Sequence, residues 1–155
     1  MRDSTARGTL YFYNNTVVSK RTDNTTLLRL STNGETCDFR NNIVWTSASG
    51  DHLALLNQAG VPHLKNNWLK SGWVASHGGL TGNIHDEGGN IEGKGPGFMR
   101  PGRQNYHLVR QSPCVDAGTS LHPDAPPVKH QYVKDGKHEA RPANGPLDQG
   151  AFEVP

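Results

Sequence analysis

A short segment with two adjacent asparagines recurs three times in the first half of the chain. The copies read YFYNNTVV, DFRNNIVW and HLKNNWLK, with the asparagine pairs at positions 14–15, 41–42 and 66–67. The pairs are 27 and 25 residues apart, a period that suits one rung of a solenoid and is too long for a simple hairpin meander. The repeat therefore predicts coils that stack on one another.

Alignment of the three copies predicts which side chains face the core. Two columns are apolar in every copy and are expected to point inward: Phe12, Phe39 and Leu64, and Val17, Val44 and Leu69. Two other columns are polar or amphipathic and are expected to point outward: Tyr13, Arg40 and Lys65, and Tyr11, Asp38 and His63. This alternation is typical of strands with one face in solvent.

The asparagine pairs are expected to form corners. The inward positions on either side of each pair are five residues apart, an odd spacing that a continuous strand does not place on one face. Asparagine tolerates the left-handed conformation, and its amide can bond to the asparagine of the next rung. Apolar segments at 26–31 and 52–57 add a third strand to each coil. The chain is thus predicted to be all-β, a right-handed parallel β-helix of about three coils.

The composition agrees with a thin core and narrows the range of partners. Only 33% of the residues are hydrophobic, while glycine and proline are abundant, with 18 and 10 residues. The net charge of +2 creates no strong field, so we expect no nucleic-acid partner. No run approaches the ~20 apolar residues of a membrane-spanning helix, so we expect no membrane span. Cys37 and Cys114 form either one disulfide or two buried free thiols, and the second reading is favoured.

Several motifs of the second half occur in a fixed order. They are GPGFM (95–99), NYHL (105–108), SPCVDAG (112–118), Arg141 and DQGAFE (148–153). Together they resemble the closing segment of bacterial right-handed parallel β-helix proteins of the pectate-lyase-like type, which act on polysaccharides. The resemblance implies a polysaccharide partner and an extracellular or cell-surface location, although the chain as given begins without a signal peptide.

The expected organisation is a single domain with coils over residues 1–111 and a proline-rich capping tail over residues 112–155. The tail is expected to wrap the last coil and hide its strand edges, because exposed edges invite unwanted pairing. No cap is visible before the first coil, which predicts either missing N-terminal coils or an end-to-end homodimer.

Four residues of the tail have expected structural roles. The carboxylates of Asp116 and Asp148 are expected to accept backbone N–H groups, and Gly118 to take a positive φ angle. Arg141 is expected to pair with one of these two carboxylates.

The resemblance implies β-elimination on a uronate-containing polysaccharide, with this section mainly structural and catalysis uncertain in it alone. Such lyases use a lysine or arginine base, often with Ca²⁺ to neutralise the substrate carboxylate. A β-helix glycoside hydrolase is a related possibility. The alternative is a non-catalytic carbohydrate-binding module or an adhesin-like structural repeat at the cell surface.

The candidate site residues follow from the outward positions, which also have a plain reading as a solvated surface. The candidates for catalysis are Lys65, Arg40 and Arg29. The candidates for substrate binding are Tyr13, His52, Asn57, His77 and Trp73. Asp86 and Glu87 are the candidates for holding Ca²⁺. Trp45 and Trp68 are expected either to cover the corner or to stack on sugar rings.

Overall fold

The chain folds as an all-β solenoid of about three turns, which confirms the predicted parallel β-helix. The structure is a computed structural model that describes residues 7–133 and 135–155. One side of the coil carries β1 (Gly8–Tyr13), β4 (Glu35–Arg40), β7 (Val61–Lys65) and β9 (His85–Asp86). The second side carries β2 (Thr16–Ser19), β5 (Ile43–Thr46), β8 (Trp68–Lys70) and β10 (Ile91–Gly93). The third side carries β3 (Thr25–Leu28) and β6 (Leu53–Leu56), with the short 3₁₀ turn η1 (Gly50–His52) just before β6.

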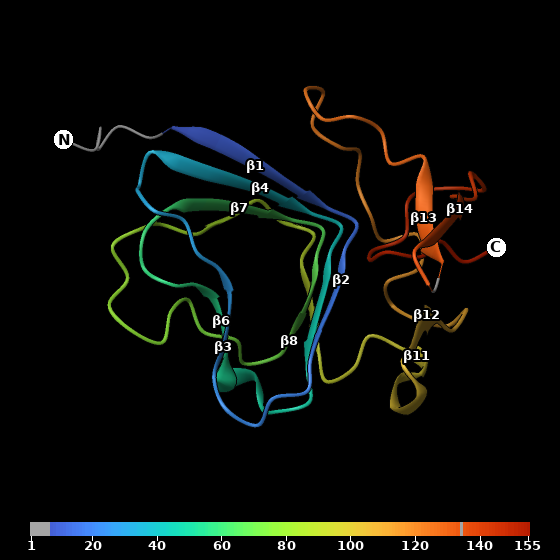
Figure 1. The fold of residues 1–155 in the computed structure, drawn as a ribbon, viewed down its shortest axis with the longest axis horizontal. Helices are drawn as coiled ribbons and strands as arrows, with labels where there is room; N and C mark the ends of the chain where they lie inside the picture. The colour runs from blue at the N-terminus through green and yellow to red at the C-terminus, as the bar shows by residue number, and fades with distance from the viewer. Residues whose placement is uncertain (1–6, 134) are drawn as a thin grey trace.

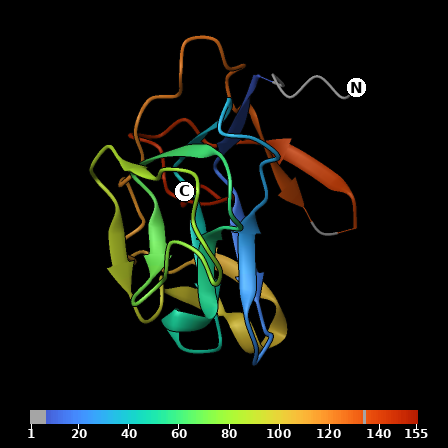
Figure 2. The ribbon, with the colours of Figure 1, turned by 90° about the vertical axis from the view of Figure 1, so that its left-hand side faces the viewer.

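Strands of successive coils lie side by side in chain order and pair in parallel (Figure 2). Parallel pairing extends to Gly93 of β10, which pairs with Lys70. The next elements form two antiparallel hairpins beside the coils: β11 (Phe98–Arg100) and β12 (Asn105–Leu108), joined by η2 (Pro101–Arg103), and β13 (His130–Val133) and β14 (Lys137–Ala140). The expected boundary between the coils and the capping tail, after residue 111, stays a prediction. Among the described residues, no helix is long and apolar enough to cross a membrane.

Both predicted inward columns are confirmed by the strand register. Phe12 pairs with Phe39 and Phe39 with Leu64, while Val17, Val44 and Leu69 pair in the same order on the second side. The rings of Phe12 and Phe39 stack with their centroids 5.2 Å apart. Because Leu69 is fully buried within this cluster, the centre of the coil is a packed apolar core rather than a channel.

The corners form where the sequence predicted them. The first asparagine of each pair takes the left-handed conformation, with φ of 51° at Asn14, 56° at Asn41 and 50° at Asn66. Asparagine accepts this conformation at lower cost than most side chains with a Cβ. The chain thereby turns from the first side of the coil to the second in every rung, and the three turns lie at the same corner of the stack (Figure 1).

The second asparagine of each pair belongs to a hydrogen-bonded ladder. The backbone N–H of Asn15 donates to Oδ1 of Asn42, that of Asn42 to Asn67, and that of Asn67 to Asn90, each at 2.9 Å. The side-chain amide nitrogen of each of these asparagines also donates to Oδ1 of the asparagine in the next rung, at 3.0–3.1 Å. Asn90 extends the ladder by one rung that the NN motif did not reveal, because Gly89 precedes it.

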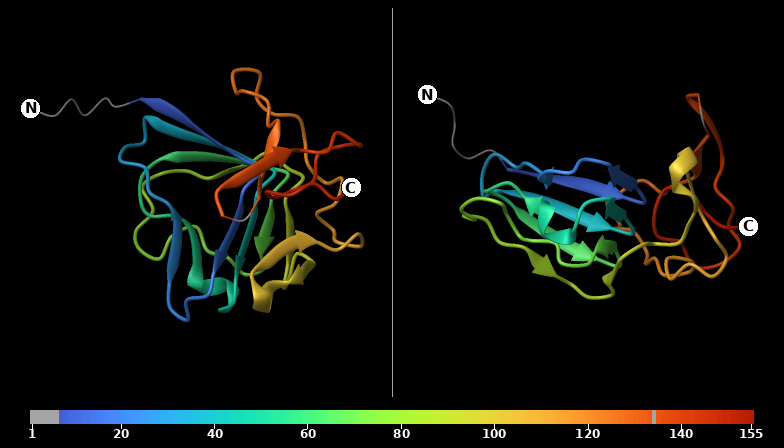
Figure 3. Two further views of the ribbon diagram at one scale, coloured as in Figure 1. Left: turned by 45° about the vertical axis from the view of Figure 1, so that its right-hand side comes forward. Right: turned by 90° about the horizontal axis from the view of Figure 1, so that it is seen from below.

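The C-terminal tail lies against the corner of the stack (Figures 1 and 3). The side-chain amide of Asn14 donates to the carbonyl of Asp148 at 3.0 Å, and that of Asn66 donates to Ala117 at 3.0 Å. Asn41 exchanges two bonds of 2.7 Å with the backbone of Thr119. The tail therefore contacts all three rungs from the side, and its role as a cap of the last coil stays a prediction.

A second apolar cluster holds the tail to the coils. Ile43 and Trp68 are register partners that point away from the inner core, and they pack with Leu108 and Cys114. Trp68 is only 1% exposed. Of the two readings for Trp68, covering the corner is therefore the correct one.

Arg141 pairs with a different carboxylate from the two that were expected. Its Nε lies 2.7 Å from Oε2 of Glu153, and both side chains are 3% exposed. The guanidinium also donates to the carbonyls of Asp148, Gly150 and Ala151 at 3.3 Å each. Arg141 thus ties together the last turn of the chain.

The turn residues of the tail confirm one expectation and correct another. The Asp148 carboxylate accepts the N–H groups of Asp116 and Val154, both at 2.6 Å, as predicted for a turn former. The positive φ belongs to Asp116, at 54°, and not to Gly118. A Cβ at Gly118 would lie 2.5 Å from the carbonyl oxygen of Leu147, so close backbone approach explains this glycine.

Both cysteines are free and fully buried, which confirms the favoured reading. Cys37 belongs to the inner core and Cys114 to the cluster under the tail. Burial raises the pKa of each thiol to about 12.

Candidate functional site

A groove of about 360 Å³ lies on the outward face of the first side of the coil. Its floor comes from the outward columns of β1, β4 and β7, and residues of the tail form one wall. The lining residues are Thr9, Tyr11, Thr36, Asp38, Arg40, His63, Glu87, His122 and Asp124. The groove thus crosses several stacked rungs, with one group of side chains from each rung.

The centre of the groove is an Asp38–Arg40 pair with two parallel hydrogen bonds of 2.6 and 2.8 Å. Arg40 also donates to the carbonyl of Ser120 in the tail at 3.2 Å. Burial opposes the positive charge, but the hydrogen bonds and charge of Asp38 outweigh it and raise the pKa of Arg40. Arg40 is therefore a fixed cation, and this state does not suit the predicted role of a base.

Tyr11 lines the groove, whereas Tyr13, the tyrosine proposed for substrate binding, is not among its lining residues. The hydroxyl of Tyr13 is buried, and burial together with the neighbouring Asp38 carboxylate raises the pKa of this phenol. Tyr11 lines the groove instead, with its ring centroid 5.6 Å from that of His122. Tyr11 is thus the aromatic side chain that a ligand in the groove would meet.

A histidine–glutamate pair stands at the end of the groove. Nδ1 of His63 lies 2.8 Å from Oε1 of Glu87, and the two side chains are 35% and 40% exposed. The ring of His85 stacks on His63 with the centroids 4.8 Å apart. The carboxylate of Glu87, which was predicted as a metal ligand, therefore has His63 as its partner.

Lys65 is the register partner of Arg40 on the next rung, as the repeat predicted. Its side chain makes no hydrogen bond or ion pair with the residues that the structure describes. Each carboxylate of the groove has a basic partner, since Asp38 contacts Arg40, Glu87 contacts His63, and Asp124 lies 3.7 Å from His122. The ammonium group of Lys65 thus has no carboxylate partner among the described residues.

Asp86 closes the asparagine ladder. Its Oδ1 accepts the side-chain N–H of Asn90 at 2.7 Å, in the place that an asparagine of a further rung would take, and the N–H of Gly88 at 2.9 Å. Over residues 7–133 and 135–155, no group of three or more His, Cys, Asp or Glu side chains is arranged to hold a metal ion. The Ca²⁺ site expected at Asp86 and Glu87 stays a prediction.

The other polar candidates lie on the third side of the coil, away from the groove (Figure 1). Nδ1 of His52 lies 2.8 Å from Oδ1 of Asn24, and Nε2 of His77 lies 3.2 Å from the carbonyl of His52. Arg29 and Asn57 are exposed just beyond β3 and β6. The structure thus separates Arg29 from Arg40 and Lys65, and the three catalytic candidates do not meet at one site.

The two remaining tryptophans have packing contacts. Trp73 packs against the inner core and its indole N–H donates to Glu92 at 2.8 Å. Trp45 meets Phe98 edge to face and lies under the ammonium of Lys70, 5.6 Å from the ring centroid. Trp73 is thus partly buried, and its predicted contact with a sugar stays a prediction.

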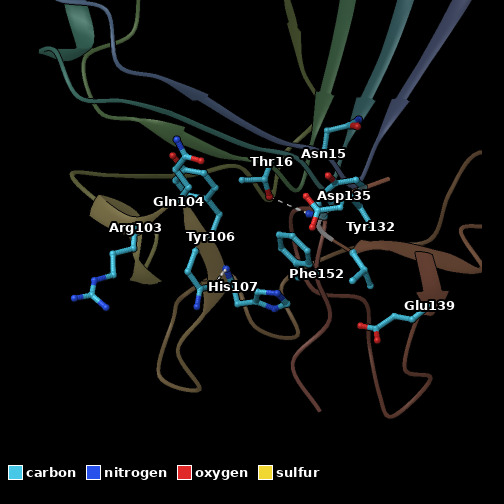
Figure 4. Close-up of a pocket in the computed structure, with 13 residues that line it drawn as sticks. Asn15, Thr16, Arg103, Gln104, Tyr106, His107, Tyr132, Asp135, Glu139 and Phe152 are labelled. Carbon is cyan, nitrogen blue, oxygen red and sulfur yellow. Dashed lines mark hydrogen bonds between the residues drawn. The ribbon is translucent and has the colours of Figure 1, made fainter. Parts of the chain in front are cut away.

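A larger hollow of about 850 Å³ lies between the two hairpins and the first corner (Figure 4). Sequence reasoning missed this site, because its walls come from segments without a repeat. Comparison of the chain with family models, curated proteins and solved structures gives no match. The functional conclusion therefore depends on the geometry of the groove and of this hollow.

Proposed function

We propose that this β-solenoid is a polysaccharide-binding module and that its groove holds a uronate-containing chain without cleaving it. The observation that carries the proposal is the arrangement of polar groups over successive rungs. Parallel strands lie about 4.8 Å apart, so the groove offers a new set of side chains at each step along its length. A polymer with a regular repeat can use such a series better than a small ligand.

The one feature beside the groove that favours an acidic polymer is Lys65. The carboxylates Asp38 and Glu87 are each held by a basic side chain, whereas Lys65 is left without a partner among the described residues. A uronate carboxylate beside Lys65 would supply the missing negative charge. Hydroxyl groups of the same chain would meet the donors and acceptors of the paired side chains, with Tyr11 as the apolar contact.

Binding without cleavage accords with the state of the catalytic candidates. Arg40 is held as a cation, and Arg29 lies on another side of the coil. A lyase reaction is the second candidate, favoured by Lys65, since an unpaired lysine beside a bound uronate is placed as a base. This candidate retains the pectate-lyase-like resemblance and would need Ca²⁺ held in part by the substrate.

Affinity electrophoresis in gels that contain polygalacturonate or alginate tests the proposal. We expect retardation of the natural chain, with or without Ca²⁺, and weaker retardation of the Tyr11→Ala variant. Tyr132→Ala removes an exposed ring outside the groove and is the matched control. Equal mobility in gels with and without the polymers, or equal retardation of the two variants, would contradict binding in the groove.

The same polymers distinguish binding from catalysis. A lyase releases unsaturated products that absorb in the ultraviolet, and we expect no such absorbance during incubation. If the absorbance grows and disappears in the Lys65→Ala variant, the second candidate is correct and Lys65 is the base.

A further inference from the structure

We propose that the hollow between the two hairpins is a second binding site, which takes a short uncharged saccharide. Its residues come from three places: Asn15 and Thr16 at the first corner, residues 103–107 around β12, and a wall that contains Tyr132 and Phe152 (Figure 4). A hollow of about 850 Å³ lies within the range of ordinary small-molecule sites. None of these residues lines the groove, so the inference does not depend on the proposed function.

Aromatic rings give the hollow an apolar surface. His107 and Phe152 stack with their centroids 4.0 Å apart, and Tyr106 is held edge to face against Phe98 at 5.2 Å. Tyr132 lines the hollow with 55% of its surface exposed. The C–H groups on one face of a pyranose ring pack well on such rings, whereas its hydroxyl groups point sideways towards polar neighbours.

Polar side chains surround the rings and are available to a ligand. Arg103, Gln104 and the Tyr132 hydroxyl make no side-chain hydrogen bond within the described part of the chain. Gln104 has a φ of 58°, a left-handed conformation that is uncommon for this residue type. This conformation ends η2, where the N–H of Gln104 donates to the carbonyl of Pro101 at 3.1 Å.

The charges of the hollow exclude a polyanion as its occupant. Arg103 lies on one side, and Asp135 and Glu139 lie across from it (Figure 4). A uronate that approaches Arg103 would also meet the field of the two carboxylates, while hydroxyl groups can bond to both walls. The occupant is therefore an uncharged saccharide, in contrast to the acidic chain proposed for the groove.

The test is a ¹H–¹⁵N NMR titration of the full chain with cellobiose, maltose and lactose, each at millimolar concentration. We expect at least one disaccharide to shift signals of residues 103–107 and 151–152 while signals of the groove stay in place. The Tyr132→Ala variant should bind about 2- to 10-fold more weakly, which is the range for the loss of one aromatic stacking contact. Because Tyr132 is exposed, this variant is expected to fold, and an unchanged backbone spectrum checks it.

Leu80→Ala, at an exposed position outside both the hollow and the groove, is the control and should leave disaccharide binding unchanged. The inference is overturned if none of the three sugars shifts the signals of the hollow, or if Tyr132→Ala binds as tightly as the natural chain. Digalacturonate serves as the charged comparison and should bind the hollow more weakly than the neutral sugars. Failure of this site would leave retardation by polygalacturonate unaffected, so the two proposals are tested separately.

Discussion

Replacement of Asn42 by alanine tests the energetic role of the asparagine ladder. The fully buried Asn42 side chain accepts two hydrogen bonds from Asn15 and donates two more, to the carbonyl of Phe12 at 2.7 Å and to Asn67 at 3.1 Å. Each such bond contributes about 1 kcal/mol net, so the loss of four predicts a destabilisation of about 4 kcal/mol. This is a large part of the ~5–15 kcal/mol that stabilises an ordinary domain.

Asn15→Ala is the matched comparison at the end of the ladder. The Asn15 side chain donates two hydrogen bonds, to Tyr13 and to Asn42, and it is only half-buried. Its removal is expected to cost about 1–2 kcal/mol. Neither Asn42 nor Asn15 has a positive φ, so the comparison measures the side chains and not the corner conformation.

Equilibrium unfolding in urea, followed by circular dichroism, gives both free energies of unfolding. The slope of the free energy of unfolding against urea concentration should stay the same in the two variants, because the surface exposed on unfolding does not change. Asn42→Asp places a carboxylate oxygen against the carbonyl of Phe12 and Oδ1 of Asn67 and buries a charge, so it should destabilise the chain more than alanine does. Equal destabilisation by Asn42→Ala and Asn15→Ala, or a cost below about 1 kcal/mol for Asn42→Ala, would refute the reasoning.

Two further predictions concern buried groups. Arg141→Ala leaves the Glu153 carboxylate buried without its partner and should cost about 3–5 kcal/mol in thermal unfolding, whereas a change within about 1 kcal/mol would show that the pair adds no stability. For Cys37 and Cys114, thiol reagents should label the native chain far more slowly than the unfolded chain, and rapid native labelling would contradict their burial. Because burial raises each thiol pKa to about 12 from an ordinary 9, stability should be intact below pH 9. It should fall as the pH rises towards 12, by up to about 1.4 kcal/mol per thiol and pH unit, and a Cys37→Ala, Cys114→Ala double variant should lose this dependence.

Features that repeat could be predicted from the sequence. Phe39 and Val44 lie five residues apart across a corner, and alternation within each strand placed both in the core. The left-handed φ of Asn41 follows from the same odd spacing. The outward columns placed Arg40 and Lys65 side by side, which the strand register confirms, and Arg40 lines the groove.

The rest depends on contacts that have no period in the sequence. Arg40 and Ser120, and Asn41 and Thr119, are about 80 residues apart, and no local pattern indicates that they meet. The partner of Arg141 was missed because several carboxylates lie close to it along the chain. The packing of Trp73 against the core has no signal in the sequence, because an aromatic residue that packs on a core and one that binds a sugar look alike there.

The contacts of the tail have a consequence for the length of the solenoid. Asn14, Asn41 and Asn66 each bond to a different point of the tail, and these points match rungs about 4.8 Å apart. A coil inserted between two of these corners would move one corner out of hydrogen-bonding distance, although the ladder itself would continue. The tail thus sets the number of coils between the first and third corners, and variation in length by duplication of a rung is confined to the parts of the stack outside them.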